Sequence, residues 1–173
     1  MRTLFTFDFK NYRPDGTVGR RPSVRGVIIR GDKIALVHSK KYDYYKFPGG
    51  GIQEGEAHLE TLIREVMEEV GLCVVPESVR EYGYILRKEK GRIEDLFIQE
   101  NFYYLCDVED EAVHQRLDDY EAEEEFTLVW TDPRTAIEAN RNHDHGDKTS
   151  DIARHMMERE ALVLEKLLEE RYF

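Results

Sequence analysis

Three glutamates, Glu65, Glu68 and Glu69, lie three and four residues apart within one segment of the chain. On an α-helix this spacing places them on one face, where like charges mildly destabilise the helix. Two interpretations are open: a solvated acidic surface, or a site where carboxylate oxygens bind a divalent cation. The spacing alone does not establish the cation site, so the flanking residues must decide.

The flanking residues fit a longer pattern. In order along the chain it comprises Gly50, Glu56, Arg64-Glu65-Val66, Glu68-Glu69 and Gly71-Leu72. This is the Nudix box, G-x5-E-x7-R-E-U-x-E-E-x-G-U with U aliphatic, and the sequence therefore resembles a Nudix hydrolase. The resemblance implies an α/β/α sandwich, a mixed β-sheet flanked by helices. It also implies Mg²⁺- or Mn²⁺-dependent hydrolysis of a nucleoside diphosphate linked to another group.

Roles for individual residues follow from their positions in the box. By resemblance, Glu65 and Glu69 are the principal metal ligands, Glu68 is a further ligand, and the backbone carbonyl of Gly49 joins them. Arg64 resembles the box arginine that pairs with carboxylates and orients them through charge-assisted hydrogen bonds. The chemistry suits these residue types, because divalent metals neutralise phosphate charge and lower the pKa of a bound water.

The resemblance also implies a further carboxylate, supplied by a later loop as metal ligand or general base. The candidates precede the last predicted strand, and they are Glu121, Glu123, Glu124 and Glu125. Glu124 lies closest to the expected position and is our choice among them. A solvated acidic loop is the alternative for most of the four.

Candidate substrate contacts come from the segment before the glycines and from the second predicted strand. Tyr45 and Phe47 could stack on a base, although aromatic residues also serve as core packing. Arg25 and Lys46 could bind phosphate or ribose. We therefore predict a nucleotide-type small molecule as substrate, and the sequence does not identify which one.

The net charge of −11 disfavours a nucleic-acid partner. The charge is segregated, since the first 46 residues are basic and the remainder is strongly acidic. An anion could bind such an acidic chain only where lysine, arginine or a divalent metal intervenes. Glutamates that bind a metal would account for part of the acidic charge.

These residues must be positioned by a mixture of strands and helices. Periodicity and turn residues predict strands at 4–9, 24–29, 34–37, 82–87, 96–106 and 126–130. They predict helices at 56–70, from 133, and along a final amphipathic stretch from 152 to 168, with a short helix in the acidic connection after 106. Leu59, Ile63, Val66 and Val70 should form the buried stripe of the helix that carries the glutamates.

We expect one domain over residues 1–173, because no linker, repeat or low-complexity tract interrupts the chain. No apolar run is long enough to span a membrane, and no signal peptide is visible. Cys73 and Cys106 have no metal-ligand spacing and are typical of a reducing compartment, so we expect a cytoplasmic protein. The final helix could close the core or form a homodimer.

Other functions stay open. A Nudix-fold binding or regulatory module without catalysis would commonly lack box glutamates, whereas Glu65, Glu68 and Glu69 are all present. An RNA 5′-end pyrophosphohydrolase is a further alternative, against which the net charge argues. The sequence favours an active pyrophosphohydrolase.

Overall fold

The structure is a computed structural model that describes all residues from 1 to 173. Its strands are β1 (Thr3–Asp8), β2 (Val18–Arg20), β3 (Ser23–Val27), β4 (Ile29–Arg30), β5 (Lys33–Ser39), β6 (Tyr44–Lys46), β7 (Arg80–Glu89), β8 (Leu96–Leu105) and β9 (Phe126–Thr131). Its helices are α1 (His58–Val70), α2 (Asp119–Glu123), α3 (Pro133–Asn142) and α4 (Asp151–Glu169), with a 3₁₀ turn η1 (Pro76–Ser78).

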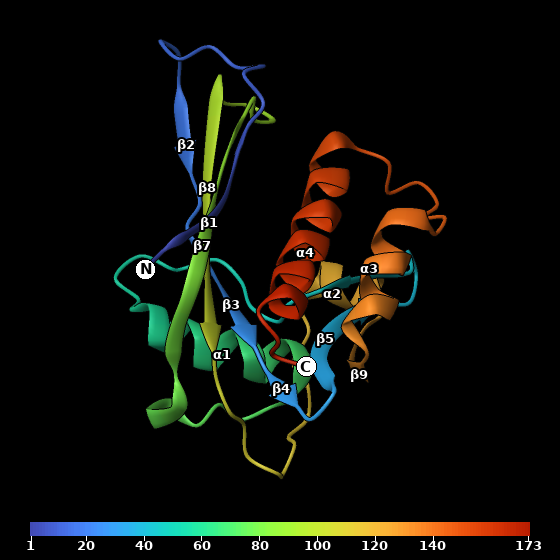
Figure 1. Cartoon of the computed structure of the whole chain (residues 1–173). Helices are drawn as coiled ribbons and strands as arrows, with labels where there is room; N and C mark the ends of the chain where they lie inside the picture. The colour runs from blue at the N-terminus through green and yellow to red at the C-terminus, as the bar shows by residue number, and fades with distance from the viewer.

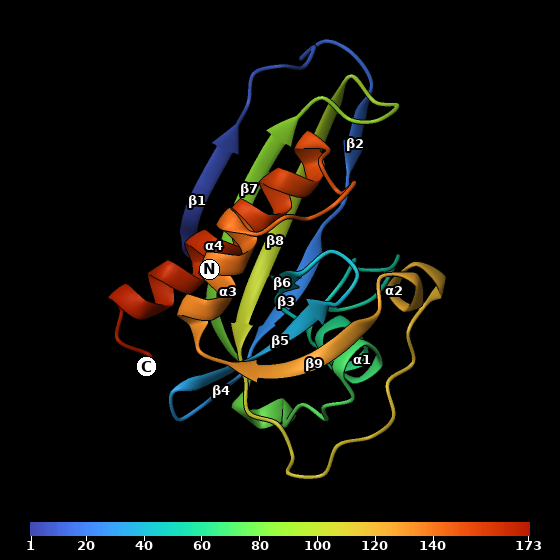
Figure 2. The ribbon, with the colours of Figure 1, turned by 90° about the vertical axis from the view of Figure 1, so that its right-hand side faces the viewer.

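The strands form two sheets. In the five-stranded mixed sheet, β7 and β8 are antiparallel, β1 runs parallel to β7, and β2 and β3 run parallel to β8. In the four-stranded antiparallel sheet, β5 pairs with β4, β6 and β9. Figures 1 and 2 show β1, β2 and the β7–β8 hairpin extending beyond the rest of the molecule as an arm.

Helices cover both sides of the strands. Helix α1 contacts β3, β5 and β9, whereas α3 and α4 pack against each other and against β6, on the opposite side (Figure 2). Strand β5 is buried on both faces: Ala35 and Val37 belong to the cluster around α1, and Ile34 and Leu36 to the cluster around α4. This arrangement confirms the predicted α/β/α sandwich.

The predicted elements are present, although the strand predicted at 24–29 is divided into β3 and β4, and β2, β6 and η1 are additional. Strands β2 and β6 lie in segments predicted as loops, because their pairing partners β8 and β5 are supplied by the fold and not by local pattern. The final helix uses its apolar residues to close the core, since Val163, Leu164 and Leu167 are buried within the chain. None of the helices combines the length and the apolar character needed to cross a bilayer.

The buried face of α1 differs from the predicted stripe. Val66 and Val70 are buried as expected, but Leu59 is 41% exposed and Leu62 is buried instead. Glu69 is also buried, at 1% exposure. The helix is therefore rotated so that one edge of its glutamate patch faces inward, and this rotation creates the site.

Candidate active site

The glycine loop before α1 lies along β3 as an added backbone segment. Val24 N donates to Gly50 O at 2.9 Å, and Gly26 N donates to Pro48 O at 2.8 Å. Gly49 has φ +138°, and a Cβ there would approach Val24 O to 2.2 Å. A Cβ on Gly50 would lie 2.2 Å from a carboxylate oxygen of Glu65. Only glycine lets the loop approach β3 and the Glu65 carboxylate this closely.

Glu69 joins the loop to the preceding strand. Its carboxylate accepts from Lys46 Nζ at 2.6 Å and from Gly49 N at 2.8 Å. Both Lys46 and Glu69 are buried, so their charges are paired away from solvent. Burial raises the pKa of the neighbouring Glu65, and Arg64 opposes that effect. Of the box glutamates, Glu69 is buried and Glu65 half-buried at this edge of α1, whereas Glu68 is more exposed and faces Arg64.

Arg64 orients the carboxylates on the exposed side of α1. It makes a bidentate pair with Glu56, with both N–O distances 2.7 Å, and donates from Nη1 to Glu65 at 2.7 Å. A longer contact of 3.3 Å reaches Glu68. The Arg64 hydrogen bonds lower the pKa of Glu56 to about 2. These contacts are those predicted for a box arginine.

The chain between β8 and α2 crosses the C-terminal end of α1. Val113 N donates to Gly71 O and Arg116 N to Glu68 O, both at 2.8 Å, and the Gln115 amide donates to Glu69 O. These bonds satisfy carbonyls that the end of a helix leaves without partners. As a result, α2 begins directly beside Glu69.

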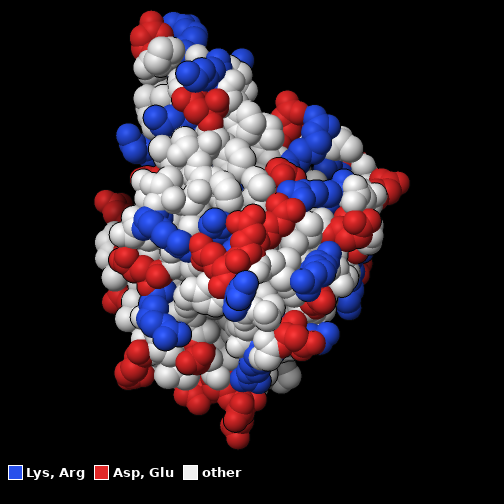
Figure 3. Space-filling view, in the orientation of Figure 1, with Lys and Arg blue, Asp and Glu red and all other residues white.

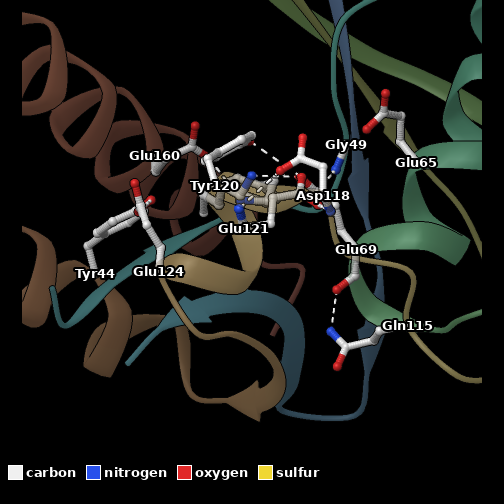
Figure 4. Close-up of polar contacts among 12 residues, drawn as sticks. Tyr44, Gly49, Glu65, Glu69, Gln115, Asp118, Tyr120, Glu121, Glu124 and Glu160 are labelled. Carbon is white, nitrogen blue, oxygen red and sulfur yellow. Dashed lines mark hydrogen bonds and ion pairs between the residues drawn. The ribbon is translucent and has the colours of Figure 1, made fainter. Parts of the chain in front are cut away.

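The carboxylate that α2 brings to Glu69 is Glu121 (Figure 4). Glu121 is 6% exposed. It is fixed in a capping box, in which Asp118 accepts from Glu121 N at 3.0 Å and Glu121 accepts from Asp118 N at 3.0 Å. Burial, and then the charge of Glu69, raise the pKa of Glu121 to about 7.

Glu124, our choice from the sequence, lies elsewhere. It accepts from Tyr44 Oη at 2.6 Å and pairs with Lys148, and its side chain is not part of the cavity lining. The structure therefore brings Glu121, and not Glu124, to the box glutamates. Choosing correctly among the four candidates requires knowing how the chain crosses the C-terminal end of α1.

A cavity of about 300 Å³ opens beside these residues. Its ionisable lining comprises cationic Arg21, Arg25, Lys46, Arg87, Lys148 and Arg159 and acidic Glu65, Glu69, Asp118 and Glu121. The cationic groups outnumber the acidic ones by six to four, although the whole chain carries −11. The cavity is thus the place where this acidic protein can hold an anion.

The predicted substrate residues are divided between the cavity and the core. Arg25 and Lys46 line the cavity, and the Nε and Nη1 atoms of Arg25 are buried without a hydrogen-bond partner. Phe47 is fully buried and packs edge-on against Tyr103, with ring centroids 5.3 Å apart. The structure leaves Phe47 no surface for a substrate, which corrects that prediction.

Tyr45 does not lie where its predicted role, stacking on a base, would require. It stacks on His38 with ring centroids 4.4 Å apart, and it does not line the cavity. Successive residues of a strand point to opposite faces, so Tyr44 and Lys46 reach the cavity while Tyr45 points away. The aromatic residues that do line it are Tyr44, Tyr120 and Phe126.

The donor set fits a hard divalent cation. No three acidic, histidine or cysteine side chains converge to enclose a metal as they stand, because Glu65, Glu68 and Glu69 each turn toward a cationic side chain. Yet carboxylate and carbonyl oxygens are the ligands that Mg²⁺ and Mn²⁺ prefer. The glycine loop lies against the Glu65 carboxylate, so closely that a Cβ on Gly50 would be 2.2 Å from one of its oxygens.

Surface charge follows the predicted segregation only in part. Figure 3 shows acidic and basic side chains intermixed over the middle of this face and mainly acidic ones along its lower edge. That edge corresponds to the chain after β8, which includes Asp107, Glu109, Asp110 and Glu111. On this face, the acidic lower edge therefore lies at the end opposite the arm.

Comparison with known proteins agrees with this geometry. The family model described as the NUDIX domain matches residues 19–152. An 8-oxo-dGTP diphosphatase of Buchnera aphidicola is 30% identical over 96 residues, which is 47% of this chain and 72% of that protein. An RNA pyrophosphohydrolase of Psychromonas ingrahamii is 41% identical over 66 residues, 37% of this chain and only 35% of that protein.

Solved structures show the same fold. The E. coli ORF135 protein matches with TM-score 0.57 and 19% identity, covering 90% of this chain and 95% of that one. A NUDIX hydrolase from Nitrosomonas europaea matches with TM-score 0.57 and 17% identity, covering 81% and 87%. Together with the family model, which spans more than half of the sequence, these matches lead to one conclusion. The chain belongs to the Nudix hydrolase family.

Proposed function

We propose that this protein is a divalent-metal-dependent pyrophosphohydrolase that cleaves a nucleoside-diphosphate-linked substrate by attack of water at phosphorus. The observation that carries the proposal is the cavity beside α1. Three buried or half-buried carboxylates, Glu65, Glu69 and Glu121, share it with cationic Arg25 and Lys46. Phosphate oxygens need cations, and the metal that assists hydrolysis needs carboxylates.

Each residue has a role that its contacts support. Glu65 and Glu69 would hold Mg²⁺ or Mn²⁺, with Glu68 and the carbonyl of Gly49 as further ligands. Such a metal supplies phosphate neutralisation and a more acidic water. Arg64 holds Glu65 and Glu68 in place. Arg25, whose buried donor atoms lack partners, would bind phosphate oxygen.

Glu121 is our candidate for the general base. It lines the cavity next to Glu69 and makes no ion pair, so it is free to accept a proton from water. Glu124, in contrast, is engaged by Tyr44 and Lys148. This assignment replaces the choice made from sequence.

The substrate class is a nucleotide. Relatives named 8-oxo-dGTP diphosphatase and RNA pyrophosphohydrolase act on phosphoric anhydrides of nucleotides. In this chain the exposed ring of Tyr120 lines the cavity and could stack on the flat face of a base. We propose substrates of the nucleoside triphosphate, ADP-ribose or nucleotide-sugar type, and a cytoplasmic setting. Light scattering would show whether the protein forms a homodimer.

A substrate panel tests the proposal. Nucleoside triphosphates, ADP-ribose, nucleotide sugars and dinucleoside polyphosphates are incubated with Mg²⁺ or Mn²⁺, and phosphate or nucleotide release is followed. We expect turnover that chelator abolishes and that Glu69→Gln reduces about a thousandfold. Glu60→Gln is the matched control, because Glu60 lies exposed on the same helix.

The alternative is a Nudix-fold binding module without catalysis. It predicts nucleotide binding in the wild type with no turnover of any panel member. Wild-type turnover that Glu69→Gln leaves unchanged would instead remove the box carboxylates from the mechanism.

A further inference from the structure

A second cavity continues from the first toward the arm. It has a volume of about 550 Å³ and shares Arg21, Arg87, Gln99 and Ile152 with the first. Its far end is formed by the β7–β8 turn, where Lys90 and Arg92 line it. The two cavities therefore adjoin at Arg87 and Gln99, beyond the box glutamates.

Arg87 is the residue at this junction whose contacts are least complete. It comes from β7, is 4% exposed and lines both cavities. Its Nε lies 3.2 Å from Glu89 Oε1, but neither that Nε nor Nη1 makes a hydrogen bond. Buried donors without acceptors are costly and uncommon in folded proteins.

The neighbouring groups supply only part of what Arg87 needs. Glu89 Oε1 is an ionic partner for Nε, at 3.2 Å, while His155 lies 2.9 Å from the other Glu89 oxygen, Oε2. Nη1 of Arg87 has no acceptor. The second buried guanidinium, Arg159 of α4, is satisfied by Glu160 and by Asn101 Oδ1, which lies 3.1 Å from Nη1. Gln99 donates to Ser23 Oγ at 3.3 Å.

Two guanidinium groups close together also repel each other. Burial, and then the positive charge of Arg159, lower the pKa of Arg87 to about 10. A single anion between them would relieve both the repulsion and the unpaired donors. Both arginines line the first cavity, so an anion that enters it can reach them.

We propose that Arg87, together with Arg159, binds a second phosphate group of the substrate, separate from the diphosphate at Glu65 and Glu69. The inference rests on the proposed pyrophosphohydrolase function and specifies its substrate class. A phosphate has several acceptor oxygens and matches the planar fork of a guanidinium. Lys90 and Arg92 extend the positive lining outward from this point and outnumber Glu94, the one acidic residue that lines the second cavity.

The substrate would then be a nucleotide that carries a phosphate beyond its 5′ diphosphate or triphosphate. That phosphate could be a terminal monoester or the diester that links a following nucleotide. The two sources share their chemistry at Arg87 and differ in what continues into the second cavity.

A binding experiment without metal or turnover tests the site itself. Inorganic phosphate is titrated into chelator-treated protein, and the thermal unfolding midpoint is followed. We expect phosphate to stabilise the wild type and Arg154→Gln, the matched control on the exposed side of α4, and to bind Arg87→Met about tenfold more weakly. Equal phosphate affinity in all three proteins would overturn the proposal.

A conservative variant keeps the test informative if Arg87→Met does not fold. Arg87→Lys keeps the charge but loses the bidentate fork, so it should fold and show phosphate affinity between wild type and Arg87→Met. Wild-type affinity in Arg87→Lys together with an unfolded Arg87→Met would mean that Arg87 has a structural role only.

Kinetics then distinguish the two phosphate sources. The substrates are adenosine 5′-triphosphate, adenosine 3′-phosphate 5′-triphosphate and the 5′-triphosphorylated dinucleotide pppApA. We expect KM about tenfold lower for substrates with a second phosphate, and that advantage should vanish in Arg87→Met while kcat changes little. An advantage for the monoester alone excludes a following nucleotide, and an advantage for neither substrate overturns the proposal.

The two proposals fail in different ways. If no substrate is hydrolysed but phosphate binding depends on Arg87, the hydrolase function fails and the anion site stands. If hydrolysis is metal-dependent but phosphate binding is indifferent to Arg87, the hydrolase stands and the site fails.

Discussion

Next to α1, the buried carboxylates Glu65 and Glu69 each contact a cationic side chain, whereas next to β7 the guanidinium of Arg87 has donors without acceptors. We refer to these regions as the carboxylate end (Glu65, Glu69, Glu121) and the arginine end (Arg87, Arg159) of the cavity. One protein thus holds buried charge in two ways, with internal counter-ions at one end and incomplete pairing at the other.

The difference indicates which kind of ligand each end of the cavity would bind. At the carboxylate end, Lys46 pairs with Glu69, so a metal that bound there would compete with an internal cation. At the arginine end, Glu89 Oε1 lies 3.2 Å from Arg87 Nε, but Arg87 Nη1 has no acceptor. Pairing is thus more complete at the first end, and the second gains more from an anionic ligand.

The largest expected effect separates Glu121 from Glu124. Glu121→Gln should lower kcat about a thousandfold, because its carboxylate is the candidate base beside Glu69. Glu124→Gln should lower it less than about fivefold, because Glu124 is held by Tyr44 and Lys148 and does not itself line the cavity. Steady-state kinetics with Mg²⁺ measure both, and a larger loss in Glu124→Gln would reverse our assignment.

Removing the internal counter-ion gives the next effect. Lys46→Met leaves the Glu69 carboxylate, 1% exposed, without its ion pair, which should cost about 3 kcal/mol of unfolding free energy in chelator. Mg²⁺ should restore more stability to this variant than to the wild type, since the metal replaces the lost cation. Urea unfolding with and without Mg²⁺ measures this.

An exposed ion pair provides the control for that variant. Lys41 pairs with Glu123 at 2.8 Å, but both side chains are largely solvated. Lys41→Met should cost much less than Lys46→Met and show no additional response to Mg²⁺. If Lys46→Met behaved like Lys41→Met, the carboxylate end would not depend on its internal cation.

The two ends also differ in how far the sequence could predict them. At the carboxylate end the sequence signal is local, because the helical spacing of the glutamates and the resemblance to the Nudix box predict roles for Glu65, Glu69 and Arg64 without the fold. The burial of Glu69 was missed, because the stripe of α1 was predicted from apolar residues alone. Leu59 was placed inside and is 41% exposed.

The remaining errors come from long-range pairing. Strand β6 exists because β5 pairs with it, and without that knowledge the alternation of Tyr44, Tyr45 and Lys46 could not be assigned to faces. Glu121 was not preferred because its position depends on the chain crossing the end of α1. The arginine end had no local signal, since Arg87 and Arg159 come from β7 and α4.

Replacing Arg87 and Arg159 separately compares how much each one contributes to the free energy of unfolding. Arg159→Met removes hydrogen bonds to Glu160 and Asn101 and leaves Glu160, 0% exposed, with an unpaired charge, which should cost about 3 kcal/mol. Arg87→Met also removes an ionic partner of buried Glu89, but its own donors lack hydrogen bonds and His155 stays beside Glu89, so it should cost less, about 2 kcal/mol. Urea unfolding without phosphate measures both, and equal losses would show that Arg87 is fully paired in solution.

The smallest effect concerns Glu56, which supports the carboxylate end through Arg64. Glu56→Gln should cost about 1 kcal/mol at pH 7, because it removes the charge from a bidentate pair. The pKa of Glu56 is lowered to about 2 by the Arg64 hydrogen bonds, so the native state favours its ionised form. Its contribution is therefore present above about pH 4.5 and is lost as the pH falls toward 2.

The difference in unfolding free energy between Glu56→Gln and the wild type should accordingly shrink between pH 5 and pH 3, as followed by urea unfolding at each pH. Glu54→Gln is the control, because Glu54 is exposed in the same loop and should leave the pH dependence unchanged. A Glu56→Gln cost that stayed constant down to pH 3 would mean that the pairing with Arg64 does not stabilise the charged carboxylate. In that case Arg64 would hold the carboxylate end through Glu65 and Glu68 alone.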